Sequence, residues 1–170
     1  KFAQVQERLR QKGRRTGICA LFYGGPGVGK TETIRQIAKA TGRDIFMVDM
    51  ALKSKWIGES EKNLRQVFKT YRNLVNESEV APILLFNEAD AIFGKRLNEE
   101  TDSEKLNNTL QNILLQEMEN LNGILLATTN MTENFDSAFE RRFLYKINFK
   151  SPSVGVKAKI WKSMVDELSD

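Results

Sequence analysis

The chain has 170 residues, a length that suits one ordinary domain with a hydrophobic core and is too short for two full domains. Its hydrophobic fraction of 41% and charged fraction of 28% are those of a globular protein and exclude a disordered one. The 26 basic and 22 acidic residues leave a net charge of +4, which suits a polyanionic ligand but is too small to indicate nucleic acid by itself.

Two residue counts narrow the possible chemistry. Histidine is absent, which excludes Ser-His-Asp and Cys-His catalysis and leaves acid–base work to carboxylates, lysine or tyrosine. Cys19 is the single cysteine, which excludes an internal disulfide and favours a reducing, cytoplasmic location.

No apolar stretch approaches the roughly 18 residues of a membrane-spanning helix. The chain begins at Lys1 rather than Met, so we expect it to be part of a longer protein.

Short apolar runs alternate with amphipathic stretches after a lead-in helix and linker at 1–16. We expect strands at 18–23, 44–49, 83–86, 124–127 and 144–149. Apolar residues at helical spacing run over 34–41, 64–74, 106–121 and 153–168, and 94–103 is expected to be a mobile loop. Such alternation predicts a three-layer α/β/α fold, in which helices cover both faces of a five-stranded parallel sheet. Ligands of such sheets bind at the carboxyl ends of the strands.

The strongest motif is the run GGPGVGKT at 24–31, which matches the Walker A pattern G-x-x-x-x-G-K-[ST] between a predicted strand and a predicted helix. Its glycines allow a tight loop whose N–H groups surround a phosphate, and the following helix adds its positive end. Lys30 is expected to bridge the β- and γ-phosphates of ATP, and Thr31 to place its hydroxyl on Mg²⁺. The alternative is a glycine-rich turn that merely joins strand to helix. The expected nucleotide-binding residues are Gly25, Pro26, Gly27, Val28, Gly29, Lys30, Thr31 and Glu32.

A second polar cluster ends the third predicted strand. The segment 83–88, ILLFNE, resembles a Walker B motif, whose usual Asp-Glu pair orients the magnesium shell and polarises the attacking water. Here Asn87 replaces the aspartate, so we expect Thr31 and Asn87 at the metal with weaker Mg²⁺ coupling and slower turnover. Glu88 is the expected general base, with a plain surface carboxylate as the alternative. Asp90, two residues further on, could support either group.

These motifs, in this order and spacing, resemble the AAA+ ATPases over residues 17–165, and more narrowly the AAA enzymes that remodel or unfold proteins. The resemblance implies a P-loop NTPase fold. The stretch at 54–64 is similar to the pore loop of that family, in which an aromatic–hydrophobic–glycine triplet grips an extended polypeptide. Here the triplet would be Trp56, Ile57 and Gly58, and the alternative is that Trp56 packs in the core.

Two further stretches carry the resemblance. Asn130 closes the segment ATTN at 127–130 and corresponds to the sensor-1 residue, which contacts the γ-phosphate or the attacking water; a buried capping asparagine is the alternative. The segment 135–143 is similar to the family's arginine-finger region, with Arg141 and Arg142 both at finger positions. In the family such fingers reach the nucleotide of a neighbouring subunit, which implies a homo-oligomeric ring, expected to be a hexamer. Ordinary surface ion pairs are the alternative.

The family pattern divides the chain into an ATPase core at 17–150 and the beginning of a helical lid at 151–170. Only the first lid helix is present, and the sensor-2 residue that the family carries in the lid lies outside the chain. We therefore expect this piece to bind nucleotide poorly and to assemble weakly.

The sequence thus predicts an ATP-hydrolysing AAA+ motor that acts on polypeptide. A DNA-handling AAA+ ATPase of the loader type is one alternative, although the basic residues are dispersed rather than striped. A nucleotide-dependent switch with low turnover is the other, suggested by Asn87.

Overall fold

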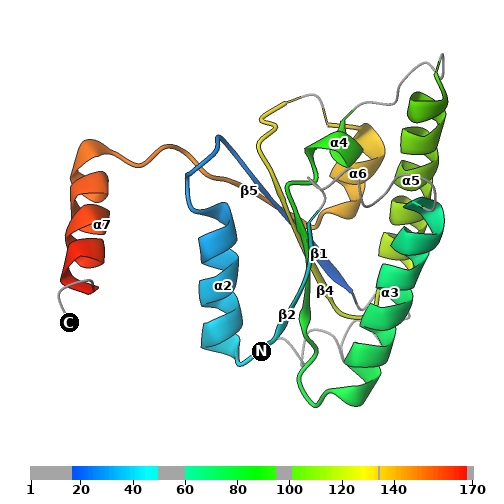
Figure 1. The fold of residues 1–170 in the computed structure, drawn as a ribbon, viewed down its shortest axis with the longest axis horizontal. Coiled ribbons are helices and arrows are strands. Elements are labelled where there is room, and N and C mark those ends of the chain that lie inside the picture. The colour runs from blue at the N-terminus through cyan, green and yellow to red at the C-terminus, as the bar shows by residue number, and fades with distance from the viewer. Residues whose placement is uncertain (1–16, 50–59, 95–100, 134, 168–170) are drawn as a thin grey trace.

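The structure is a computed structural model, and it describes residues 17–49, 60–94, 101–133 and 135–167 (Figure 1). The predicted lead-in at 1–16, the pore-loop triplet Trp56, Ile57 and Gly58, and residues 95–100 of the predicted loop lie outside these ranges. Within them, five strands form one sheet in the order β2-β3-β4-β1-β5, and every neighbouring pair is parallel. The strands are β1 (Ile18–Tyr23), β2 (Ile45–Asp49), β3 (Ile83–Asn87), β4 (Ile124–Thr129) and β5 (Tyr145–Asn148).

Helices cover both faces of this sheet, which confirms the predicted three-layer fold. Figure 1 shows α2 against one face, and α3, α4, α5 and α6 against the other. The described helices are α2 (Lys30–Thr41), α3 (Ser60–Glu77), α4 (Asp90–Phe93), α5 (Asp102–Glu119), α6 (Ser137–Arg142) and α7 (Val154–Glu167). The central strands β3 and β4 are buried along almost their whole length, as expected for parallel strands between two helical layers.

Several boundaries differ from the sequence predictions. The short helices α4 and α6 were not predicted, because neither is long enough to show helical periodicity. Strand β4 continues beyond its apolar run through Thr128 and Thr129, which are both buried. Helix α5 begins at Asp102, inside the predicted loop, because Thr101 and Glu104 form a capping box there. The mobile-loop prediction was therefore wrong for 102 and 103.

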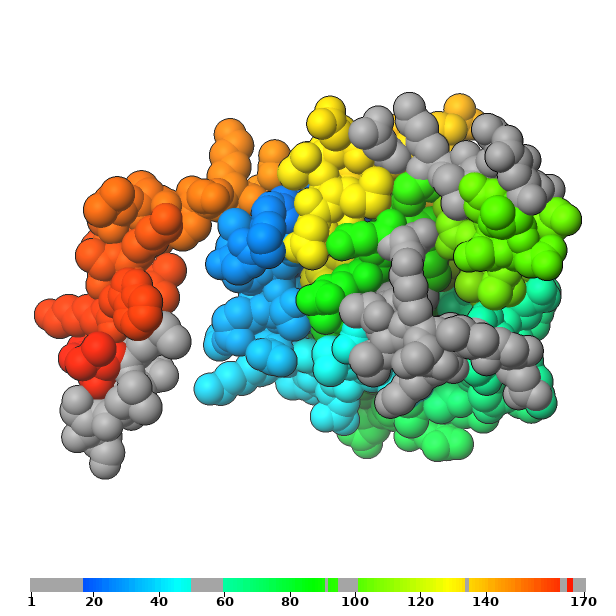
Figure 2. All heavy atoms as spheres, turned by 45° about the horizontal axis from the view of Figure 1, so that its top comes forward, coloured from blue at the N-terminus to red at the C-terminus, as the bar shows by residue number. Residues whose placement is uncertain are grey.

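The C-terminal elements are much less buried than the centre of the sheet. All four residues of the edge strand β5 are exposed. Helix α7 forms where the spacing of apolar residues predicts it, yet the side chains of Ile160 and Trp161 are 49% and 68% exposed. In the space-filling view the α7 segment projects away from the α2 side of the molecule (Figure 2). In the part of the chain that the structure describes, no helix is long and apolar enough to cross a membrane.

Candidate functional site

The glycine-rich loop connects the carboxyl end of β1 to the start of α2. Gly24, the first loop residue, has φ of 143°, and a Cβ there would lie 2.2 Å from the carbonyl oxygen of Phe149, so only glycine fits. Gly29 caps α2 in the left-handed conformation, and no side chain caps the first turn of the helix. First-turn N–H groups of α2 can thus donate hydrogen bonds to an anion, which the positive end of the helix also favours.

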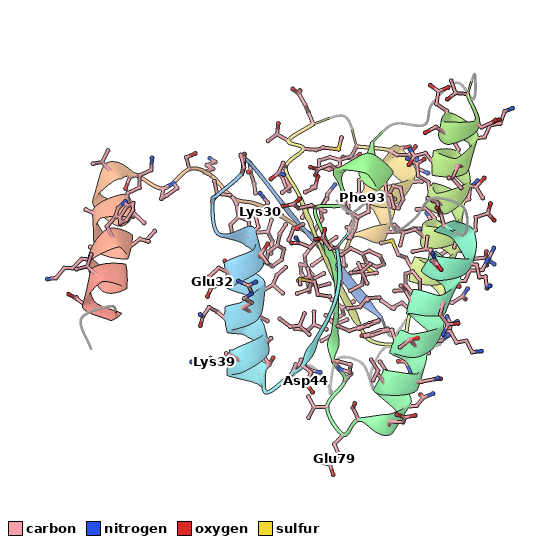
Figure 3. All side chains as sticks on the ribbon, viewed as in Figure 1. Lys30, Glu32, Lys39, Asp44, Glu79 and Phe93 are labelled. Atoms are coloured by element: carbon pink, nitrogen blue, oxygen red, sulfur yellow. The ribbon has the colours of Figure 1, made fainter. Side chains whose placement is uncertain are left out.

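Lys30 extends from the first turn of α2 into the site and is buried. Its ammonium donates hydrogen bonds of 2.7 Å to the carbonyl oxygens of both Gly24 and Gly25, and one of 3.0 Å to Oδ1 of Asn130. Burial lowers the pKa of Lys30, and the carboxylates of Asp90 and Glu88 partly oppose that shift. Figure 3 shows Lys30 on the sheet side of α2, whereas Glu32 and Lys39 lie on the outer side of the helix.

The two residues predicted at the metal lie side by side. The hydroxyl of Thr31 donates to Oδ1 of Asn87 over 2.9 Å, and the hydroxyl of Thr128 donates to the same oxygen over 3.0 Å. Uncharged oxygens of this kind fit the preference of Mg²⁺ for oxygen ligands when the nucleotide phosphates supply the negative charge. The side chains present therefore suit a magnesium ion held mainly by phosphate, with a smaller contribution from the protein than a carboxylate would make.

Glu88 lies at the turn after β3 and has a left-handed φ of 55°, a conformation that costs a non-glycine residue about 1–3 kcal/mol. Two hydrogen bonds to Thr128 of β4 hold this turn. The Glu88 N–H donates to Oγ1 of Thr128 and the Ala89 N–H donates to its carbonyl oxygen, each over 3.0 Å. The Glu88 side chain is exposed and lines the same pocket as Lys30. Tertiary contacts thus keep a strained residue in place, a situation typical of functional sites.

Asn130 follows the last residue of β4 and faces Lys30 across the site. It is exposed, which excludes the buried capping role. Its backbone N–H donates to Oδ1 of Asp90 over 2.7 Å, and its Nδ2 donates to Oδ2 of the same carboxylate over 3.3 Å. The hydroxyl of Thr129 also donates to Asp90 Oδ1. Groups that follow β1, β3 and β4 in the chain therefore meet at one edge of the sheet, as parallel topology requires.

Lys30, Thr31, Glu88 and Asn130 line a pocket of about 380 Å³, within the size range of small-ligand sites, whereas Asn87 and Asp90 do not line it. Gly25 does not line it and contributes its carbonyl to Lys30 instead. Three residues that were not predicted from the sequence also line it: Arg35, Thr128 and Thr129. Arg35 follows Thr31 by four residues on one helix face, a spacing that could have indicated it. The lining residues are Pro26, Gly27, Val28, Gly29, Lys30, Thr31, Glu32, Arg35, Glu88, Thr128, Thr129 and Asn130.

The two predicted finger arginines lie on α6, outside this pocket. Arg142 is 23% exposed, forms an ion pair with Glu119 of α5 and donates to the Ala138 carbonyl over 3.2 Å. Arg141 is exposed and forms no ion pair with any residue in the described ranges. The neighbouring arginines thus differ: one is fixed within its own chain, and the other points into solvent.

Comparison with known proteins agrees with this arrangement. Residues 20–151 match the family described as "ATPase family associated with various cellular activities (AAA)". The chain belongs to the AAA family. This confirms the resemblance inferred from the Walker motifs and the segments that follow them.

Three curated AAA relatives illustrate the similarity. Cell division protein C of Sulfolobus acidocaldarius is 32% identical over 79% of this chain and 37% of its own length. A probable spastin homolog of Brugia malayi is 30% identical over 86% of this chain and 32% of its own. Vacuolar protein sorting-associated protein 4 of Dictyostelium discoideum is 30% identical over 84% of this chain and 32% of its own length. The chain thus spans about a third of the length of these relatives.

Proposed function

We propose that this AAA chain binds ATP in the pocket around Lys30 and hydrolyses it, as the motor of a homo-oligomeric ring that remodels polypeptide. One observation carries the proposal: a buried lysine, an exposed glutamate and an asparagine from three separate segments converge on one pocket beside an uncapped helix N-terminus. An anion-binding loop with a carboxylate opposite it suits phosphoryl transfer, in which catalysis is mostly positioning and charge stabilisation.

Five residues in or beside the pocket have a role in this mechanism. The ammonium of Lys30 exchanges its bonds to the loop carbonyls for phosphate oxygens of ATP, whose negative charge also raises the lysine pKa again. Thr31 and Asn87 would hold magnesium together with the phosphates, and bound magnesium would neutralise charge on the β- and γ-phosphates. Glu88 accepts a proton from the attacking water, and Asn130 orients that water by a hydrogen bond.

The finger role falls to Arg141 in this proposal. Arg142 already pairs with Glu119, and reaching a neighbouring nucleotide would break that ion pair. Arg141 is exposed and forms no ion pair within the described ranges, so its guanidinium is available to the γ-phosphate of ATP on an adjacent subunit. Fingers supplied in trans raise phosphoryl-transfer rates by about 10³- to 10⁵-fold. The ring, expected to be a hexamer, is part of the proposal, and its support is that Arg141 lies outside the pocket of its own chain.

Polypeptide is the proposed substrate, gripped by Trp56, Ile57 and Gly58. The support is the similarity of the segment at 54–64 to the family's pore loop and the AAA membership of the chain.

The first test is ATP binding and steady-state hydrolysis with Mg²⁺. Lys30→Ala should abolish binding, because the pocket loses its central cation, whereas the matched control Lys39→Ala, on the outer side of the same helix, should bind normally. Glu88→Gln should keep ATP binding and lose turnover. Unchanged affinity in Lys30→Ala would exclude this pocket as the nucleotide site.

The second test addresses the ring. Specific activity should rise with protein concentration, and Arg141→Ala should remove that rise while Arg142→Ala mainly lowers thermal stability. Mixing Glu88→Gln with Arg141→Ala subunits should restore hydrolysis, because the first supplies an intact finger and the second an intact pocket. If the two variants stay inactive after mixing, whichever of them is in excess, a finger acting in trans is excluded.

A nucleotide-dependent switch with low turnover is a second candidate, and Asn87 favours it. Its Oδ1 already accepts two hydroxyl hydrogens and carries no formal charge. If Asn87 merely restrains the turnover of a motor, Asn87→Asp should raise the Mg²⁺-dependent rate of hydrolysis. A chain that binds ATP, and whose Asn87→Asp variant also fails to hydrolyse it, is a switch.

A further inference from the structure

The carboxylate of Asp90 joins two elements of the site by hydrogen bonds. Asp90 begins α4, directly after the Glu88 turn, and its carboxylate accepts from three groups. These are the hydroxyl of Thr129, the backbone N–H of Asn130 and the side-chain Nδ2 of Asn130. All three donors belong to the two consecutive residues at the end of β4. Asp90 therefore fastens the end of β4 to the start of α4.

The same contacts determine which atom of the Asn130 amide faces the pocket. On one side the amide meets Asp90, whose ionised carboxylate can only accept hydrogen bonds. On the other side it meets the ammonium of Lys30, which can only donate. Both neighbours require the same orientation, with Nδ2 toward Asp90 at 3.3 Å and Oδ1 toward Lys30 at 3.0 Å. Reversing the amide would place donor against donor and acceptor against acceptor.

We propose that Asp90 is the positioning residue for Asn130 and holds its side chain with the carbonyl oxygen toward the pocket. Asn130 then presents an acceptor, not a donor, to whatever occupies the pocket. This inference deepens the proposed function and rests on it for its catalytic consequence: Asn130 accepts a hydrogen bond from the attacking water or from Lys30 and does not donate to a phosphate oxygen. The water is thereby oriented with its remaining proton free for Glu88.

The first measurement is a double-mutant cycle on ATP hydrolysis. Asp90→Asn preserves the size of the side chain but places an NH₂ group where an acceptor is needed, so kcat should fall by about 100-fold, the typical effect of a misplaced group. ATP affinity should change by no more than about threefold, because Lys30 and the loop remain. In an Asn130→Ala background the same substitution should have no further effect on kcat.

A merely structural role would give a different result. Asp90→Asn would then slow turnover by the same factor whether or not Asn130 is present, and additive effects overturn the proposal. Asp102→Asn is the matched control, since Asp102 also begins a helix but is exposed and lies in α5. It should leave kcat unchanged. Thermal midpoints of all variants identify any that fail to fold, and Asp90→Glu, which keeps the charge, should recover part of kcat.

A second readout does not depend on hydrolysis. In a ¹H–¹⁵N correlation spectrum, the side-chain NH₂ pair of Asn130 is identified by its loss in Asn130→Ala. Its resonances should shift in Asp90→Asn and stay in place in Asp102→Asn. An NH₂ pair that is unmoved by Asp90→Asn overturns the positioning role even if ATP is hydrolysed. Absence of hydrolysis in the parent chain contradicts the proposed function, while this spectrum still decides the positioning role.

Discussion

The two faces of the sheet are built very differently. Among the described residues, the core beneath α3, α4, α5 and α6 contains 21 buried side chains, whereas the core beneath α2 contains 8. The larger core includes the rings of Phe93, Phe139 and Phe143, which pack edge to face with centroids 5.0 and 5.3 Å apart. The smaller core has one ring stack, Phe22 on Phe149 at 5.2 Å.

The two halves of the candidate site, the carboxylates and the glycine-rich loop, depend on different cores. Glu88 and Asp90 lie at the start of α4, and the end of that helix is held by Gln111, which donates over 2.8 Å to the Ile92 carbonyl and over 2.9 Å to the Gly94 carbonyl. Helix α6 joins the same core through Phe139, and the Asp136 N–H before it donates to the Phe93 carbonyl over 3.0 Å. The phosphate loop and Lys30 instead depend on α2 and the smaller core. The face with the larger core, here called the thick face, therefore supports Glu88 and Asp90, and the face with the smaller core, the thin face, supports the loop at 24–29.

The largest expected effect comes from breaking the thick face at Phe93. Its ring is 1% exposed and touches the rings of Phe139 and Phe143. Phe93→Ala should therefore lower the free energy of unfolding by about 3–5 kcal/mol, from lost burial and a cavity that helices cannot fill. Urea unfolding followed by circular dichroism measures this. Phe93→Leu, which retains most of the volume, should cost clearly less; equal losses would mean that ring packing does not hold α4 and α6 together.

A smaller effect is expected from Tyr71, on the same face. The fully buried hydroxyl lies 2.9 Å from the Pro82 carbonyl oxygen and accepts from the Ile124 N–H over 2.8 Å. Tyr71→Phe leaves that N–H without its partner and should cost about 1–3 kcal/mol near neutral pH. Chemical unfolding of both proteins at pH 7 gives the difference.

The pH dependence of that difference sharpens the test. Burial raises the pKa of Tyr71 from its ordinary value of 10.0 to about 12. Between these two values the unfolded chain releases a proton that the folded chain retains, so stability falls as pH rises, by about 3 kcal/mol in total. Tyr71→Phe lacks this loss. The advantage of the parent should therefore shrink above pH 10, and a constant advantage would mean that the hydroxyl is not buried.

Much of this architecture could be predicted from the sequence because its signals are local. Buried strands appear as apolar runs, and the loop at 24–31 carries its own pattern. The capping box of Thr101 and Glu104 was equally local and would have corrected the predicted loop. Contacts between distant segments could not be predicted in this way. The Glu119 partner of Arg142 lies 23 residues away, and only the register of β3 beside β4 brings Asp90 to Asn130.

The smallest effect is expected on the far side of the thin face, at α7. Trp161 is 68% exposed there, and the helix projects away from the α2 side (Figure 2). Trp161→Ala should change the free energy of unfolding by less than about 0.5 kcal/mol, because a side chain that stays in water loses little on truncation. The matched control is Ile34→Ala in α2, whose side chain is fully buried and should cost about 2–5 kcal/mol. Thermal unfolding of the two variants measures the contrast. A large loss of stability in Trp161→Ala would mean that α7 packs against the thin face and that the smaller core extends beyond the buried residues of the sheet and α2.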